Sequence, residues 1–186
     1  EEAPSSAYKT EIMAQRNDPV FQEKLRRGIK FEHEVISPFL RKEFDEFWIS
    51  ECRNHRHADH GGPKLISGDD ELTLPDFRLD HKVDPKHNLW IDAKLKHHPT
   101  RLWGDWYFTI DKKAWGQYNR IIQEFPKMGF WILMGCELDH CVYQFDFKAL
   151  VPIHYRYDNE HGTGAYPHYR QDEMTLLIKD PWTVDL

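Results

Sequence analysis

The stretch Leu89–Lys96 is where residue types and spacing most clearly indicate chemistry. Its residues alternate between apolar and polar, and successive side chains of a β-strand point to opposite faces. As a strand, it would turn its apolar residues to a core and present Asp92 and Lys94 on the other face, between Trp90 and Lys96. A carboxylate and an ammonium group would therefore project side by side from one strand.

A second acid, Asp76, lies in the segment 72–80, which is predicted to be the preceding strand. Hairpin pairing of the two strands would bring Asp76 to the face that carries Asp92 and Lys94. Clustered carboxylates repel one another, and a hard cation such as Mg²⁺, which prefers oxygen ligands, relieves that conflict. Such a cation lowers the pKa of water and offsets charge on a phosphate, while a lysine orients or deprotonates the water or stabilises the transition state. The three residues together predict hydrolysis of a phosphodiester.

The triplet Asp-x-Lys does not identify a site alone, because it occurs five times, beginning at Asp80, Asp84, Asp92, Asp111 and Asp146. Asp84 lies in a predicted turn, and Asp111 precedes a predicted helix, where aspartate is an ordinary N-cap. Asp146 with Lys148 lies on a predicted strand and is the serious alternative. We favour Asp92 because an acid lies upstream on a partner strand and a helix follows downstream.

A third acid, Glu32, is expected from the helix predicted between residues 19 and about 47. At about 100° per residue, Glu32 lies in the middle of an apolar stripe, whereas Glu34 lies on the opposite side with basic residues. A carboxylate that faces a core is costly unless it is paired or binds a metal ion. We therefore predict that Glu32 belongs to the metal site, with a salt bridge to a partly buried lysine or arginine as the alternative. The stripe consists of Leu25, Ile29, Ile36, Phe39 and Leu40.

These residues resemble the signature of the PD-(D/E)xK nuclease superfamily, in which an acid after proline is followed, on the adjoining strand, by acid-x-lysine. The sequence has Pro75-Asp76 and then Asp92-Ala93-Lys94. Many members also carry a helix glutamate in a Gly-x-x-x-Glu setting, which Gly28 to Glu32 matches. The resemblance implies a restriction-endonuclease-like fold of the α/β (α+β) class, with a central mixed sheet flanked by helices in the order α-β-β-β-α-β.

The same resemblance implies a Mg²⁺-dependent deoxyribonuclease, and we expect an endonuclease for which Mn²⁺ substitutes. It assigns Asp76 and Asp92 as metal ligands, with Glu32 assisting directly or through water. The carbonyl of Ala93 often joins the metal shell in such sites, and Lys94 would be the catalytic lysine. Many relatives place a glutamine or lysine on the next helix, a role open here to Gln117, Lys113 or Lys112. The Gln-x-x-x-Tyr spacing of exonuclease-like members is absent, because Tyr118 directly follows Gln117.

Residues beyond the active strand are predicted to contact nucleic acid, because basic side chains neutralise a phosphate backbone. The alternative is a solvated strand edge, where lysine hinders aggregation. Trp103, Trp106 and Tyr107 could stack on bases, but we expect them to pack in the core. The predicted nucleic-acid contacts are Lys96, His97, His98, Arg101, Lys113 and Gln117.

A histidine-rich segment, 52–60, contains Cys52, His55, His57 and His60 together with one aspartate. Zinc takes such ligands, but the spacing fits no familiar zinc template, so we do not expect structural zinc. We favour a DNA-contacting loop or surface histidines.

These groups need a framework, and the sequence predicts one α/β domain. Residues 1–18 are predicted as an N-terminal arm, 19–150 as the nuclease core and 151–186 as a C-terminal extension packed on that core. Gly28 and Pro38 are the weak points of the first helix. The predicted helices are 19–47 and 111–125, and the predicted strands are 47–53, 72–80, 89–97, 128–136, 141–147 and 175–179, with 103–110 left open.

The composition suits a globular chain of 186 residues, 40% hydrophobic, with a net charge of −6. That charge argues against a protein that coats nucleic acid with its whole surface, but not against a local basic groove beside an acidic site. No run of about eighteen apolar residues and no signal peptide are visible, so we expect a cytoplasmic protein without membrane contact. Three cysteines, an odd number, suit reduced thiols.

DNA is the expected partner, and a homodimer is expected by analogy with small single-domain members of the superfamily. Two alternatives stay open on the same fold. One is an exonuclease or a nuclease that acts on RNA. The other is a catalytically silent nucleic-acid-binding domain, against which the presence of both acids and the lysine argues.

Overall fold

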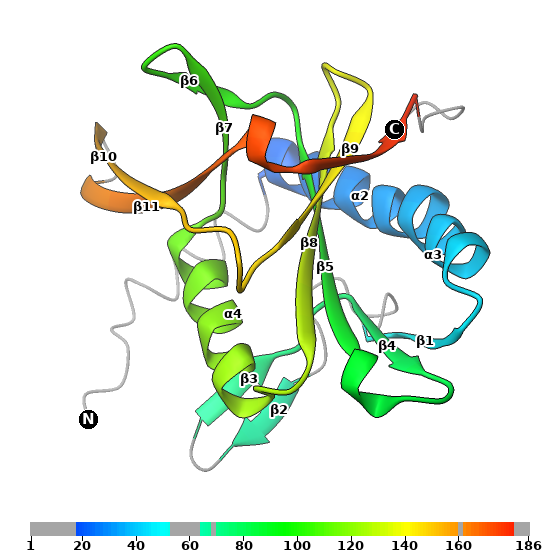
Figure 1. Cartoon of the computed structure of the whole chain (residues 1–186). Coiled ribbons are helices and arrows are strands. Elements are labelled where there is room, and N and C mark those ends of the chain that lie inside the picture. The colour runs from blue at the N-terminus through cyan, green and yellow to red at the C-terminus, as the bar shows by residue number, and fades with distance from the viewer. Residues whose placement is uncertain (1–17, 53–63, 68–69, 160–161, 181–186) are drawn as a thin grey trace.

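The computed structural model describes residues 18–52, 64–67, 70–159 and 162–180. Its centre is a six-stranded sheet in the order β1-β4-β5-β8-β9-β12, with helices on both sides (Figure 1). Neighbouring strands are antiparallel except β5 and β8, which are parallel. The strands of this sheet are β1 Phe47–Glu51, β4 Phe77–His81, β5 Leu89–Lys96, β8 Gly129–Cys136, β9 Cys141–Asp146 and β12 Thr175–Lys179.

The predicted N-terminal helix is one continuous rod with a π-helical turn in its middle. The side chain of Asp18 caps its start by accepting a hydrogen bond from the N–H of Val20 at 3.0 Å. In the π turn the N–H of Ser37 donates to the carbonyl of Glu32, five residues back. This wider turn directly precedes Pro38, which has no N–H to donate, so the rod passes the proline without breaking. Its segments are α2 Pro19–Phe31, η1 Glu32–Ile36 and α3 Ser37–Glu43.

The rod covers one face of the main sheet, and α4 (Lys112–Glu124) covers the other (Figure 1). Alternation along β5 explains how both faces become cores. Ile91 and Ala93 pack in the cluster that contains Phe31, whereas Trp90 packs in the cluster that contains Tyr118. The predicted facing of β5 is therefore confirmed.

The crossover between the parallel strands β5 and β8 contains a hairpin and then α4. The hairpin strands are β6 (Thr100–Leu102) and β7 (Asp105–Thr109). Asp111 caps α4 by accepting a hydrogen bond from the N–H of Ala114 at 2.8 Å, which confirms its predicted role.

A four-stranded antiparallel sheet, β10-β11-β7-β6, lies beside the main sheet (Figure 1). The sequence did not predict this sheet. Within residues 151–186, β11 pairs with β7 and β12 pairs with β9, so this part of the chain adds strands to both sheets. The remaining elements are β2 Lys64–Ser67, β3 Asp70–Thr73, β10 Ile153–Asn159, β11 Gly162–Arg170 and the 3-10 turns η3 Pro85–His87 and η4 Gln171–Glu173.

The predicted core order α-β-β-β-α-β is confirmed, as the rod followed by β1, β4, β5, α4 and β8. Two predicted boundaries are wrong. The first helix ends at Glu43 rather than near residue 47, and the predicted strand 72–80 is two strands, β3 and β4. Pro75 lies in the break, because a proline cannot donate to a ladder. Among the described residues, no helix is long and apolar enough to cross a membrane.

Candidate active site

The site begins where β4 and β5 separate. Their last pair is Phe77 with Ile91, and one further step of this register would place Asp76 opposite Asp92. The strands no longer pair there, and Oδ2 of Asp76 accepts a hydrogen bond from the N–H of Ala93 at 2.8 Å. The Asp76 carboxylate thus takes the place of a strand carbonyl. It is fixed at the point where the two strands separate, which we call the fork, and only 9% of the residue is exposed.

Asp92 is the centre of a small polar cluster under α4. Its Oδ2 accepts a hydrogen bond from the hydroxyl of Tyr118 at 2.6 Å and lies 2.5 Å from Nζ of Lys94. Asp92 is 5% exposed, and a third of the Lys94 side chain is exposed. The side-by-side placement of Asp92 and Lys94 predicted from strand alternation is therefore what the structure shows.

The electrostatics of the cluster hold Lys94 in its charged form. Burial opposes the charge, but the attraction of Asp92, supported by Asp76, outweighs it and raises the pKa of Lys94 well above its usual value. Burial, followed by the charge of Asp92, also raises the pKa of Tyr118 well above its usual value, so its hydroxyl stays a hydrogen-bond donor. Asp92 is therefore approached by one cationic and one neutral donor.

A cavity of about 230 Å³ opens beside this cluster, between β5 and the first turns of α4. Asp92, Lys94 and Tyr118 line it together with residues of β3 and α4. A small molecule or one nucleotide phosphate fits a space of this size. Its lining is Thr73, Leu74, Asp92, Lys94, Asp111, Lys113, Ala114, Gln117 and Tyr118.

Glu32 is 5% exposed and is the first residue of the π turn, a feature that often marks functional sites. The preceding residue, Phe31, packs on Gly135 of β8, where an added Cβ would lie 2.6 Å from the Phe31 ring.

Within the described part of the chain, no three His, Cys, Asp or Glu side chains converge as a ready set of metal ligands. The structure therefore brings Asp76 and Asp92 together, and the metal role of Glu32 stays a prediction.

The donors at the fork nevertheless suit a hard cation. Two nearly buried carboxylates, Asp76 and Asp92, flank Ala93, whose carbonyl is a further oxygen donor. The ammonium of Lys94 lies against Asp92 and offsets negative charge there. Carboxylate and carbonyl oxygens so placed are the ligands that a divalent cation such as Mg²⁺ or Mn²⁺ prefers.

The other Asp-x-Lys triplets have structural roles. Asp80 accepts hydrogen bonds from Nε of Arg78 and from Nδ2 of Asn88, both at 3.0 Å. Asp84 accepts a hydrogen bond from the N–H of Lys86 at 3.0 Å and caps a 3-10 turn, and Asp111 caps α4. Asp146 accepts from the backbone N–H of Lys148 at 2.8 Å. The Lys148 ammonium donates to the backbone carbonyls of Pro126, at 2.9 Å, and Met128.

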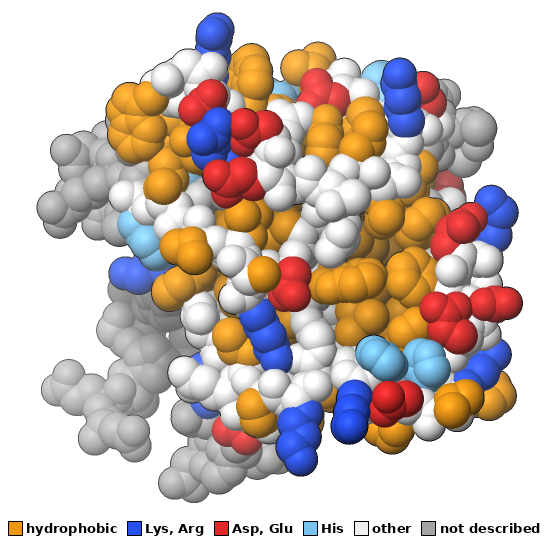
Figure 2. Space-filling model, in the orientation of Figure 1, with side chains coloured by type: hydrophobic (Ala, Val, Ile, Leu, Met, Phe, Trp, Pro, Cys, Tyr) orange, Lys and Arg blue, Asp and Glu red, His pale blue; other side chains and the backbone are white. Residues whose placement is uncertain are grey.

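The predicted nucleic-acid contacts have different surroundings. Lys113 lines the active-site cavity, and Oε1 of Gln117 accepts a hydrogen bond from the N–H of Thr73 at 3.1 Å, which ties α4 to β3. Lys96 and His97 line a second cleft, described below. His98 and Arg101 are exposed beyond β5. On the face shown in Figure 2, acidic and basic side chains are interspersed, so a phosphate contact on this face depends on local clefts.

The expectation that three aromatic residues pack in the core is right for one of them. Tyr107 is 5% exposed, but Trp103 is 74% and Trp106 is 47% exposed. Trp103 and Gly104 form the two-residue turn of the β6–β7 hairpin, both with positive φ, and Arg101 lies over the ring of Trp106. Both indoles lie in the part of the β6–β7 hairpin that extends beyond β11. On β7, pairing with β11 begins at Tyr107.

Tyr118 is the site residue that sequence reasoning missed. It was named from the sequence only as the residue that follows Gln117, and on α4 it packs against Phe130 and Phe147. A buried tyrosine hydroxyl needs a partner, and the strand beneath the helix offers Asp92. That requirement is the signal that could have found it.

The histidine-rich segment falls almost entirely within residues 53–63, outside the described residues, so the zinc alternative is not tested there. Cys52 is described and half-buried. Burial, with the nearby charge of Asp76, raises the pKa of Cys52 to about 11, which disfavours the thiolate that binds metals.

No protein-family model matches the chain, and no curated protein matches it in sequence. The structure is similar to that of Hjc, a Holliday junction resolvase from the archaeal hyperthermophile Archaeoglobus fulgidus, with a TM-score of 0.42 and 11% sequence identity. The similarity covers 74% of this chain and 87% of the resolvase chain. A TM-score of this size does not assign an activity, so the function is inferred from the geometry of the site.

Proposed function

We propose that the protein is a metal-dependent nuclease that cleaves DNA phosphodiester bonds within a strand. One observation carries the proposal: where β4 and β5 separate, the nearly buried carboxylate of Asp76 is held by the N–H of Ala93, and the neighbouring buried carboxylate of Asp92 pairs with the ammonium of Lys94. Acids and a lysine so placed suit phosphodiester hydrolysis, which needs a held cation and a positive charge beside the phosphate.

The metal ligands in this proposal are Asp76, Asp92 and the carbonyl of Ala93, with Glu32 assisting. A Mg²⁺ ion held there would lower the pKa of a water molecule and offset negative charge on the phosphate. The chain prepares both carboxylates for this task. The N–H of Ala93 fixes the position of Asp76, and the hydroxyl of Tyr118 fixes that of Asp92.

Lys94 acts on the phosphate side of the site. Its ammonium lies at the wall of the cavity, partly exposed and held by Asp92. Hydrolysis forms a bond from water oxygen to phosphorus and breaks one ester P–O bond, which leaves a phosphate monoester and a hydroxyl. During this exchange negative charge grows on the phosphate oxygens, and a fixed ammonium beside them stabilises it.

The test is cleavage of supercoiled plasmid by the purified chain with Mg²⁺, with Mn²⁺ and with EDTA. A closed circle has no ends, so metal-dependent nicking that EDTA abolishes is the expected result and establishes an endonuclease. Cleavage of linear DNA alone would indicate an exonuclease, and cleavage of RNA alone an RNA-acting enzyme. If no substrate is cleaved with either metal, the chain is a silent domain and the proposal is wrong.

A further inference from the structure

A second cleft, of about 310 Å³, lies where α2 crosses the ends of β5 and β8. Four of its lining residues carry a basic side chain, and one carries a carboxylate. We call it the α2–β5 cleft. Its lining is Lys24, Arg27, Leu95, Lys96, His97 and Glu137.

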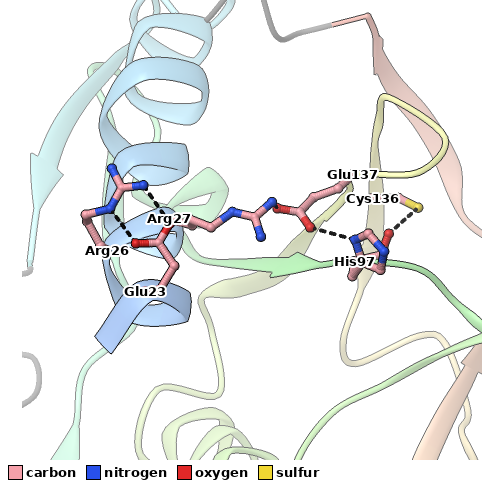
Figure 3. Close-up of polar contacts among 6 residues, drawn as sticks. All are labelled: Glu23, Arg26, Arg27, His97, Cys136 and Glu137. Carbon is pink, nitrogen blue, oxygen red and sulfur yellow. Dashed lines mark hydrogen bonds and ion pairs between the residues drawn. The ribbon is translucent and has the colours of Figure 1, made fainter. Parts of the chain in front are cut away.

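Glu137 holds two of the basic groups in place (Figure 3). One carboxylate oxygen pairs with the guanidinium of Arg27, and the other lies 3.1 Å from Nδ1 of His97. The backbone fixes Glu137 itself, because its N–H donates to the carbonyl of Lys96 at 3.0 Å. Arg27 keeps donor capacity to spare, since its buried Nε has no hydrogen-bond partner among the described residues.

The cleft has an excess of positive charge. Neither Lys24 nor Lys96 forms an ion pair with any residue that the structure describes, and Glu137 is the single acid in the lining. Arg27, Lys24 and Lys96 against Glu137 leave a net charge of +2 before His97 is counted. Burial, and repulsion from Lys94 and Lys24, lower the pKa of Lys96 against the opposing pull of Asp111. A bound anion would relieve this repulsion.

The cleft and the candidate active site share strand β5, with α2 over one face of the sheet and the active-site cavity under α4 on the other. Lys96 follows Lys94 by two positions on β5, a separation of about 7 Å between their backbones at roughly 3.3 Å per residue. Along the axis of a DNA duplex, each strand carries a phosphate about every 3.4 Å, so two nucleotides cover about the same distance. A strand whose phosphate lies beside Lys94 would therefore present another phosphate near Lys96.

We propose that the α2–β5 cleft binds a backbone phosphate of the nucleic-acid strand that enters the active site. Lys24, Arg27, Lys96 and His97 supply the donors, and Glu137 keeps Arg27 and His97 in position. This inference rests on the proposed function and adds to it a site that sets the path of the strand.

Adjacent arginines on α2 offer a matched pair for the test. Arg27 faces the cleft, whereas Arg26 forms an exposed pair with Glu23 at 2.7 Å (Figure 3). Binding of a labelled DNA duplex would be followed by fluorescence anisotropy at several salt concentrations, with Ca²⁺ in place of Mg²⁺ to limit hydrolysis. Loss of one phosphate contact lowers the slope of log affinity against log salt by about 0.9. We expect this decrease for Arg27→Ala and Lys96→Ala, and no change for Arg26→Ala.

Glu137→Gln separates phosphate binding from a structural role of the ion pair. If Arg27 binds phosphate, DNA affinity is unchanged or rises, because the amide oxygen of this variant still accepts from Arg27 and keeps it in position while the competing negative charge is gone. If Arg27 matters only through its pair with Glu137, Glu137→Gln weakens binding as Arg27→Ala does, and the inference is wrong. Equal slopes for Arg26→Ala and Arg27→Ala would also overturn it. A wild-type chain that binds no DNA at all would instead contradict the proposed function itself.

Discussion

The Asp-x-Lys triplets on β5 and at the end of β9 have the same residue types but differ in burial and in hydrogen-bond partners. Asp92 lies in the interior of β5, buried between two helical layers, and its carboxylate receives the Lys94 ammonium and the Tyr118 hydroxyl. Asp146 is the last residue of β9, and it accepts a hydrogen bond from the backbone of Lys148. The triplet becomes a site only where other elements supply partners.

The Lys148 ammonium shows what the second triplet does. It donates to the carbonyls of Pro126 and Met128, and so joins the turn after β9 to the loop that follows α4. No acid from a neighbouring strand approaches Asp146 as Asp76 approaches the fork beside Asp92, among the contacts of the described residues. We propose that the β5 triplet serves chemistry, whereas the triplet at β9 connects two parts of the chain.

The largest expected difference between the two regions is in metal binding. Asp76→Asn and Asp92→Asn keep a hydrogen-bond acceptor for Ala93 N–H and Tyr118 OH but remove the charge that holds a cation. We expect calorimetric Mn²⁺ binding to be lost in both variants and kept in Asp146→Asn. Retention of binding in Asp92→Asn, with circular dichroism showing an intact fold, would place the metal elsewhere.

A smaller effect is expected at Tyr118, which supports Asp92 from α4. Partners of metal ligands commonly change activity by about 10- to 100-fold, so Tyr118→Phe should lower the cleavage rate by roughly tenfold. Loss of a hydrogen bond to a charged group should also lower the free energy of unfolding by about 1.5–3 kcal/mol. The control is Tyr143→Phe on β9. It removes a hydroxyl that accepts a hydrogen bond from Nε2 of Gln171 at 2.7 Å. Equal cleavage rates in both variants would remove Tyr118 from the site.

The packing of the rod on β8 provides a test based on stability. Gly135→Ala would place a Cβ 2.6 Å from the buried Phe31 ring, and overpacking of a core costs about 1–3 kcal/mol. Gly28→Ala meets no atom within 4 Å, and alanine is favoured over glycine in a helix by about 1 kcal/mol. Chemical denaturation should therefore show a decrease for Gly135→Ala and an increase for Gly28→Ala. A stable Gly135→Ala variant would show that Phe31 moves freely beside Glu32.

The smallest effect is expected at Lys148, outside the active site. Lys148→Ala removes two exposed hydrogen bonds to carbonyls, and a net contribution of about 0.5–1.5 kcal/mol is usual for one such bond. The midpoint of thermal unfolding should fall slightly, and the rate of DNA cleavage should stay at the wild-type value. A cleavage defect as large as that of Lys94→Ala would remove the distinction between the two triplets.

Local pattern was sufficient to predict the placement of Asp92 and Lys94, because strand alternation fixes the face of each residue once β5 is recognised. The core order and the N-cap Asp111 followed from similar short-range rules. The break at Pro75, the π turn and the β10–β11 hairpin were not predicted, although Pro75 and Pro38 are local signals for the first two. The pairing of β11 with β7 and of β12 with β9 depends on contacts far apart in the sequence. Tyr118 needed the position of α4 over β5, which no local pattern gives.

The surroundings of Arg27 were equally hidden from the sequence. Its partner Glu137 is 110 residues away, so neither the charge excess of the α2–β5 cleft nor its nearness to Lys94 follows from spacing along the chain. For Trp103 and Trp106 the prediction of core packing was wrong. Aromatic residues usually find a core, but a hairpin that extends beyond its sheet leaves them exposed.

Plasmid nicking by single variants of the two triplets distinguishes an active site on β5 from one at the end of β9. Wild type, Asp92→Ala, Lys94→Ala, Asp146→Ala and Lys148→Ala would be compared with Mg²⁺ and with EDTA. Loss of one stabilising charge at a reacting phosphate costs about 100- to 1,000-fold in rate, so both β5 variants should lose at least that much activity and both β9 variants should keep theirs. Activity that survives Asp92→Ala and Lys94→Ala but is lost in Asp146→Ala and Lys148→Ala would contradict the account and move the active site to the end of β9.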